Sequence, residues 1–67
     1  MLIKKSITIK KHRTSLSLEK EFWDALKIIA KDKKCSVENL VAIIDAKRKT
    51  SLASSIRVYV LKFYWSD

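Results

Sequence analysis

The chain shows a short alternation of hydrophobic and polar positions, followed by longer stretches with a helical period. From residue 13 to residue 18 the sequence Arg-Thr-Ser-Leu-Ser-Leu alternates without a break. This period of two is typical of a strand with one buried face. The residues expected on its inner face are Thr14, Leu16 and Leu18. Those expected on its outer face are Arg13, Ser15 and Ser17.

A first helix is predicted over Lys20–Lys31, because apolar residues recur there at i, i+4 and i+7. This apolar stripe consists of Phe22, Leu26 and Ile29, widened by Trp23, Ala25 and Ala30. Glu19 is expected to cap the start of the helix. The polar residues 32–35 then form a connection to the next helix.

Two further helices are predicted in the second half of the chain. Ser36 is a good N-cap, since a serine hydroxyl accepts a hydrogen bond from a free backbone N–H. The stripe that follows it contains Val37, Leu40, Val41 and Ile44, and the basic residues 47–49 suit the end of this helix. Thr50 or Ser51 caps the third helix, whose stripe contains Leu52, Ile56, Val60 and Phe63.

The first eleven residues differ from the rest in carrying four lysines and only a short alternating stretch. We expect residues 1–11 to form a basic N-terminal arm with partial β character, because chain termini are usually loose unless they are tied down. Residues 12–67 are then the single folded domain.

Glycine and proline are both absent, where average usage would give roughly eight such residues in a chain of this length. Their absence excludes glycine-rich phosphate loops and argues against hairpin turns of the Asn-Gly type. Residues 13–18 are the one strong strand pattern in the sequence, so this strand has no evident partner within the chain. An isolated strand leaves its backbone donors and acceptors unpaired, so we expect antiparallel pairing with the same strand of a second chain.

The small size of the chain points in the same direction. With 67 residues, one cysteine and one histidine, it has neither an internal disulfide nor the ligands of a structural zinc site. The sequence thus predicts a homodimer. The residues assigned to a core that the second chain completes are Leu16, Leu18, Phe22, Leu26, Ile29, Leu40, Val41 and Ile44.

The net charge of +8 gives the first indication of function. Such a charge favours a polyanionic partner, although solubility alone is the simpler explanation. The chain has no apolar run that suits a signal peptide or a membrane span, so we expect a cytoplasmic protein without a membrane partner. No metal or cofactor is expected.

One short strand followed by helices is the order of a ribbon-helix-helix dimer. The resemblance extends to the sequence. Residues 12–19 (HRTSLSLE), residues 22–26 (FWDAL), residues 40–42 with Ile44-Asp45, and residues 51–58 (SLASSIRV) resemble a bacterial ribbon-helix-helix family with an added C-terminal helix. The resemblance covers about residues 6–64. The implied fold is mainly α.

The resemblance implies sequence-specific binding of double-stranded DNA and transcriptional regulation or repression. The outward strand residues of the family contact the bases, and here those positions are Arg13, Ser15 and Ser17. Arginine can bind guanine and serine can serve any base edge. The alternative is that these residues form only a solvated outer face.

The N-terminus of the second helix is expected to bind a DNA phosphate, because its free N–H groups and the helix dipole attract anions. The alternative is that Ser36 serves only as a cap. The residues assigned to phosphate binding are Ser36, Val37, Lys33, Lys34, Lys11 and Lys10.

The chain departs from the usual family pattern at three places. It has Lys11 and Lys33–Cys35 where relatives often have glycine, and Lys20 where they often have proline.

The sequence offers two other classes of function. The third helix exceeds the minimal ribbon-helix-helix core, so a protein-interaction module that binds a partner protein, such as an antitoxin, is the alternative function. An enzyme is not expected, because His12 and Cys35 have no partner residues that would make a catalytic group, and so small a chain offers little pocket.

Tyr64 and Trp65 are expected to cover the dimer or to face another partner.

Overall fold

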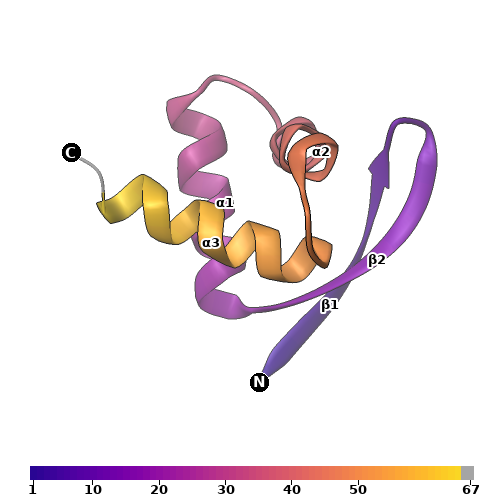
Figure 1. Ribbon diagram of the computed structural model, residues 1–67, viewed down its shortest axis with the longest axis horizontal. Coiled ribbons are helices and arrows are strands. Elements are labelled where there is room, and N and C mark those ends of the chain that lie inside the picture. Colours follow the sequence, from indigo (N-terminus) through magenta and orange to yellow (C-terminus); the bar gives the residue numbers. More distant parts are fainter. Residues whose placement is uncertain (66–67) are drawn as a thin grey trace.

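The computed structural model describes residues 1–65 and contains a two-stranded sheet and three helices (Figure 1). The elements are β1 (Leu2–Ile9), β2 (His12–Glu19), α1 (Lys20–Asp32), α2 (Val37–Lys47) and α3 (Leu52–Trp65). The expected mainly helical class and the three helices are confirmed. Residues 66 and 67, the end of the predicted domain 12–67, lie outside the described residues.

The strand predicted to have no partner within the chain has one. β1 pairs antiparallel with β2 from Leu2 opposite Glu19 to Ile9 opposite His12. The basic arm expected at residues 1–11 is thus mostly a strand, and β1 and β2 form a hairpin. Pairing with the same strand of a second chain is not needed to satisfy the backbone groups on the edge of β2 that faces β1. Such pairing would have to use the opposite edge of β2.

The hairpin turn forms without glycine because two lysines adopt positive φ angles. Lys10 has φ 49° and Lys11 has φ 70°, the signs that a two-residue type I′ turn requires at both central positions. The inference from composition against a hairpin was therefore wrong. Lys11 occupies the position where relatives often have glycine, which is consistent with this conformation.

The end of α1 also uses a left-handed residue. Lys34 has φ 58°, while the Cys35 N–H donates to the Ala30 carbonyl at 2.9 Å and the Lys34 N–H donates to the Lys31 carbonyl at 3.1 Å. These two bonds form a Schellman motif, in which glycine usually supplies the left-handed residue. Lysine takes this position here.

Two of the three expected helix caps are confirmed. The Ser36 hydroxyl accepts from the Asn39 N–H at 3.0 Å, and the Ser51 hydroxyl accepts from the Ser54 N–H at 3.2 Å. The prediction for Glu19 was wrong, since its side chain makes no capping bond. Its carboxylate instead pairs with Arg57 of α3, at 3.0 Å from Oε1 to Nε and 3.3 Å from Oε2 to Nη2.

The core lies between the inner face of the hairpin and the helices, which gather on one side of it (Figure 1). Seven of the eight residues assigned to the core are buried within the single chain, and Phe22 is only partly buried. Trp23 is buried in its place, and its Nε1–H donates to the Ile3 carbonyl at 2.9 Å. This bond fixes α1 against β1. None of the helices in residues 1–65 is long and apolar enough to cross a bilayer.

Candidate nucleic-acid interface

The hairpin presents a polar face that points away from the helices. Directly opposed residues of an antiparallel pair share a face, and the register opposes Lys4 to Ser17, Ser6 to Ser15, and Thr8 to Arg13. All of these side chains are exposed except that of Ser17, which is partly exposed. We call the surface formed by these six residues the outer face of the hairpin.

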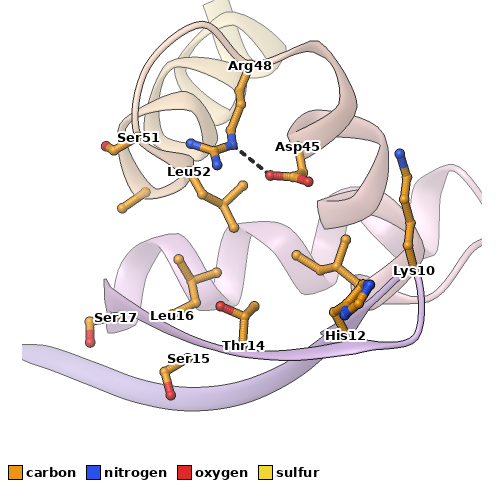
Figure 2. A pocket seen from close by; sticks show the side chains of 12 residues that line it. Lys10, His12, Thr14, Ser15, Leu16, Ser17, Asp45, Arg48, Ser51 and Leu52 are labelled. Carbon is orange, nitrogen blue, oxygen red and sulfur yellow. Dashed lines mark hydrogen bonds and ion pairs between the residues drawn. The ribbon is translucent and has the colours of Figure 1, made fainter.

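Figure 2 shows the same division of β2 from close by. The side chains of Ser15 and Ser17 point away from the helices, while those of Thr14 and Leu16 point toward α2 and α3. Leu16 is buried and Thr14 is partly buried. The alternation expected from the sequence of β2 therefore places Arg13, Ser15 and Ser17 together on one face, as predicted.

The sequence interpretation missed the half of this face that β1 provides. Lys4, Ser6 and Thr8 were hidden because the alternation of β1 is broken at Lys5, whose register partner is the buried Leu16. Lys5 is tolerated at this inner position because its Nζ lies 5.0 Å from the centre of the Trp23 ring, a cation–π contact, while the side chain stays exposed. The signal available in the sequence was the Ser-Ile-Thr-Ile alternation of residues 6–9.

The second edge of β2 is unpaired in the two-stranded sheet that residues 1–65 form. A hollow of about 540 Å³ lies beside it, between β2 and the connection from α2 to α3 (Figure 2). Arg48 lines this hollow, but its Nε donates to Asp45 at 2.7 Å and its Nη1 donates to the Thr50 carbonyl at 2.8 Å. Its guanidinium is thus held by the chain itself.

The N-terminus of α2 lies against the free edge of β1. The Thr8 N–H donates to the Glu38 carboxylate at 3.0 Å, and Thr8 is the cross-strand neighbour of Arg13. The turn lysines Lys10 and Lys11 follow directly. The structure thus brings the predicted phosphate site at Ser36 and Val37 to the same end of the hairpin as the predicted base contact Arg13.

The charges around this helix terminus are mixed. Lys34 is exposed, and Lys33 is exposed with its Nζ 5.9 Å from the centre of the Phe63 ring. Glu38 adds a negative charge in the first turn of α2, where an anion is favoured by the helix dipole. This carboxylate accepts a hydrogen bond from β1 and so anchors α2 to the hairpin. Its negative charge also opposes the binding of a phosphate at the same helix terminus.

Several ionisable side chains of the described residues form surface ion pairs. Within residues 1–65 no three His, Cys, Asp or Glu side chains are grouped so that they could hold a metal ion. The titratable groups with displaced pKa values are ion-paired surface residues. The Arg57 guanidinium lowers the pKa of Glu19 through its hydrogen bonds, and the hydrogen bond between Lys20 and Asp24 lowers the pKa of Asp24 and raises that of Lys20.

Comparison with known proteins agrees with this geometry. The sequence model of the ribbon-helix-helix domain family matches residues 2–64, which include β1 and nearly all of α3. No curated protein and no solved structure is similar enough to match the chain. Domains of this family are typically non-enzymatic DNA-binding modules that generally bind DNA as dimers. By this match over nearly its whole length, the chain belongs to the ribbon-helix-helix domain family.

Proposed function

We propose that this protein is a transcriptional regulator that binds double-stranded DNA as a homodimer, with the outer face of the hairpin in the major groove. The observation that carries the proposal is the register of the hairpin, which puts three cross-strand pairs of polar side chains on one exposed face. The major groove is about 12 Å wide and admits a two-stranded ribbon. Each chain has such a ribbon already formed.

Base contacts in this proposal come from β2. Arg13 can donate two hydrogen bonds to guanine O6 and N7, and the hydroxyls of Ser15 and Ser17 can donate to or accept from any base edge. The carboxylate that continues this face by register, Glu19 at the far end of β2, accepts from Arg57 of α3 and so does not compete for the Arg13 guanidinium. Arg13 is therefore the residue expected to contribute most to specificity.

Phosphate contacts come from the end of the hairpin and from α2. Lys10 and Lys11 extend from the turn, and Lys33 and Lys34 precede the N-terminus of α2, where Ser36 and Val37 offer backbone donors. Contacts of this kind fix the register of a protein on DNA without selecting sequence. Each phosphate that is neutralised steepens the dependence of log K on log salt by roughly 0.9.

Binding-site selection from random duplexes at a fixed salt concentration tests this proposal. The expected result is an enriched site with two-fold symmetry that contains guanine in each half, because a dimer presents Arg13 twice. Duplexes recovered without any enriched sequence would contradict specific recognition and leave only nonspecific attraction by the net charge. Loss of all binding at moderate salt, with no selected site, would overturn the proposal as a whole.

A further inference from the structure

A groove of about 530 Å³ lies between α2 and α3, outside every contact assigned to DNA. The residues that line it belong to α2, to α3 and to the connection between them, and none belongs to the hairpin. We call this hollow the α2–α3 groove. It combines an apolar lining with a strongly basic one, and the two together indicate what it binds.

The apolar lining comes from both helices and is open to water. Ile43 of α2 and Val58 of α3 are 52% and 46% exposed, while Tyr59 of α3 is partly buried. Ile44, which also lines the groove, is buried in the core. A partner that covers Ile43 and Val58 removes apolar surface from water, which favours association.

The charged residues that line the α2–α3 groove are all basic. They are Lys47, Arg48, Lys49 and Lys62, and no aspartate or glutamate of residues 1–65 lines the groove. The Arg48 guanidinium is occupied by Asp45 at 2.7 Å, so the positive potential rests on the lysines. These three side chains are exposed and come from both helices and the connection. An occupant with carboxylates therefore complements the groove in charge.

The connection from α2 to α3 is held in place by its own hydrogen bonds. Arg48 Nη1 donates to the Thr50 carbonyl at 2.8 Å, and the hydroxyls of Thr50 and Ser55 lie 3.3 Å apart. The bond from Arg48 to Asp45 joins the same connection to α2. A surface that is formed before binding loses little conformational entropy on association.

The length of the groove suits a short stretch of helix. The α3 residues that line it run from Ser55 to Lys62, and seven helical steps extend for about 10 Å. An apolar stripe at i, i+3, i+4 and i+7 of a partner helix has the same length. Such a stripe, placed between two helices, is a recurrent mode of peptide recognition.

We propose that the α2–α3 groove binds an acidic amphipathic helix of a partner protein. The apolar stripe of that helix covers Ile43, Val58 and Tyr59, and its flanking carboxylates lie near the lysines. DNA matches this groove less well, because phosphates complement the lysines but leave Ile43 and Val58 without an apolar contact. The proposal goes beyond DNA binding and uses no residue that is assigned to it.

Calorimetric titration of the full chain with three synthetic helical peptides tests the proposal. The first peptide has leucines at i, i+3, i+4 and i+7 with glutamates beside them. The second has the same leucines beside lysines, and the third keeps the glutamates but has serines in place of the leucines. The first should bind at least about 10-fold more tightly than either of the others, because it alone supplies both the charge and the apolar stripe.

Two matched pairs of variants locate the binding surface. Ile43→Ser should weaken binding of the first peptide about 10-fold, whereas Ile28→Ser on α1, where the isoleucine is 57% exposed, should leave it unchanged. Lys47→Ala combined with Lys49→Ala should weaken binding several-fold at low salt. Lys27→Ala combined with Lys31→Ala removes the same charge from α1 and should have little effect. Circular dichroism should show equal helix content in all variants.

Three results would overturn the proposal. The first is no binding of the acidic amphipathic peptide at about 1 mM or equal binding of the serine peptide. The second is an equal loss of affinity in the groove variants and their α1 controls, which would leave only attraction by the net charge. The third is displacement of the peptide by an excess of duplex DNA, which would assign the groove to DNA. A chain that binds the peptide but no DNA would contradict the proposed function and leave this inference intact.

Discussion

The outer face of the hairpin and an apolar surface of α1 and α3, formed by Ile28, Val58, Leu61 and Tyr64, are both exposed, but they differ in chemistry. The first consists of hydroxyls and cations at alternate positions of two strands, and the carboxylate that continues it, Glu19, is paired with Arg57. The second consists of aliphatic and aromatic side chains, and its neighbouring charges are paired within the chain. The first therefore suits a hydrated polyanion, and the second suits another apolar surface.

The two surfaces lie on different kinds of secondary structure, the polar one on the strands and the apolar one on the helices. The period of two in the strands keeps polar side chains on the side of the hairpin opposite the core. The helices supply the core with one stripe, and α1 and α3 expose a second apolar stripe. Substitutions on one face should therefore leave the other face unchanged.

The largest effect is expected where both faces depend on the same buried residue. Leu18 of β2 is fully buried in the core between the hairpin and the helices. Leu18→Ala should reduce the free energy of unfolding by about 2–5 kcal/mol, and DNA binding should decrease with it. Urea denaturation followed by circular dichroism measures the loss. A variant with near wild-type stability would mean that the hairpin does not pack on the helices as described.

Arg13→Ala should affect the hairpin face alone. We expect a loss of about 1–3 kcal/mol in binding to the selected site, with relaxed preference at one base position in each half. Fluorescence anisotropy with the selected duplex gives the affinity. Lys31→Ala removes an exposed cation from α1 and serves as the control for charge. If the two variants lose affinity equally and without change in sequence preference, Arg13 contributes charge and no base contact.

Lys11→Gly should change stability and DNA binding in opposite directions. Glycine adopts the positive φ of this turn position without the steric cost of a side chain, so the free energy of unfolding should rise by about 0.5–1 kcal/mol. The salt dependence of DNA binding should weaken by roughly 0.9 if Lys11 contacts one phosphate. Lys11→Ala removes the same charge without relieving the backbone, so only its salt dependence should change. Equal stabilities of the two variants would show that the turn is not strained.

Glu38→Gln should tighten DNA binding a few-fold at low salt. The substitution removes a negative charge from the N-terminus of α2, and its amide oxygen can still accept from the Thr8 N–H. Glu38→Ala removes both the charge and the bond, so it should also lower the melting temperature. Titrations at two salt concentrations check the assignment. An unchanged affinity of Glu38→Gln at low salt would place this helix terminus away from the phosphates.

The smallest effect concerns the ion pair that joins the two regions. The Arg57 guanidinium lowers the pKa of Glu19 in the folded chain. A carboxyl group with a lowered pKa stabilises the fold above its ordinary pKa, and this contribution disappears as the pH falls through the folded value. Thermal unfolding should thus show a small loss of stability below the ordinary range of glutamate. Glu19→Gln should lose less stability at low pH than the wild type. An identical acid dependence of the two proteins would contradict the pairing of Glu19 with Arg57.

The helices and most of the core could be predicted from the sequence because their signals are periodic and redundant. The stripes of all three helices are long enough to fix their inner sides, and Ser36 and Ser51 mark two helix starts with a hydrogen bond that the residue type allows. The assignment of Phe22 to the core was less accurate. Phe22 and Trp23 are adjacent, and periodicity alone does not show that the indole N–H finds its acceptor on β1.

The hairpin could not be predicted because its turn lacks glycine and because the alternation of hydrophobic and polar residues in β1 is broken. Lys10 and Lys11 adopt a conformation that usually needs glycine or asparagine, and Lys5 lies at an inner register position because Trp23 accepts its ammonium group over the ring. Half of the candidate DNA-binding face was consequently missed. Arg13, Ser15 and Ser17 were found because the alternation of β2 is unbroken.

The most direct test of the central claim is an NMR titration of the uniformly ¹⁵N-labelled chain with the selected duplex. Amide shifts are expected to concentrate on the outer face of the hairpin, at residues 4, 6, 8, 13, 15 and 17, and at the N-terminus of α2. The amides of Ile28, Val58 and Leu61 should remain unchanged, because these residues lie on the helices and not on the hairpin. Shifts confined to α1 and α3, with none on the hairpin, would contradict the claim that this chain binds DNA through its hairpin.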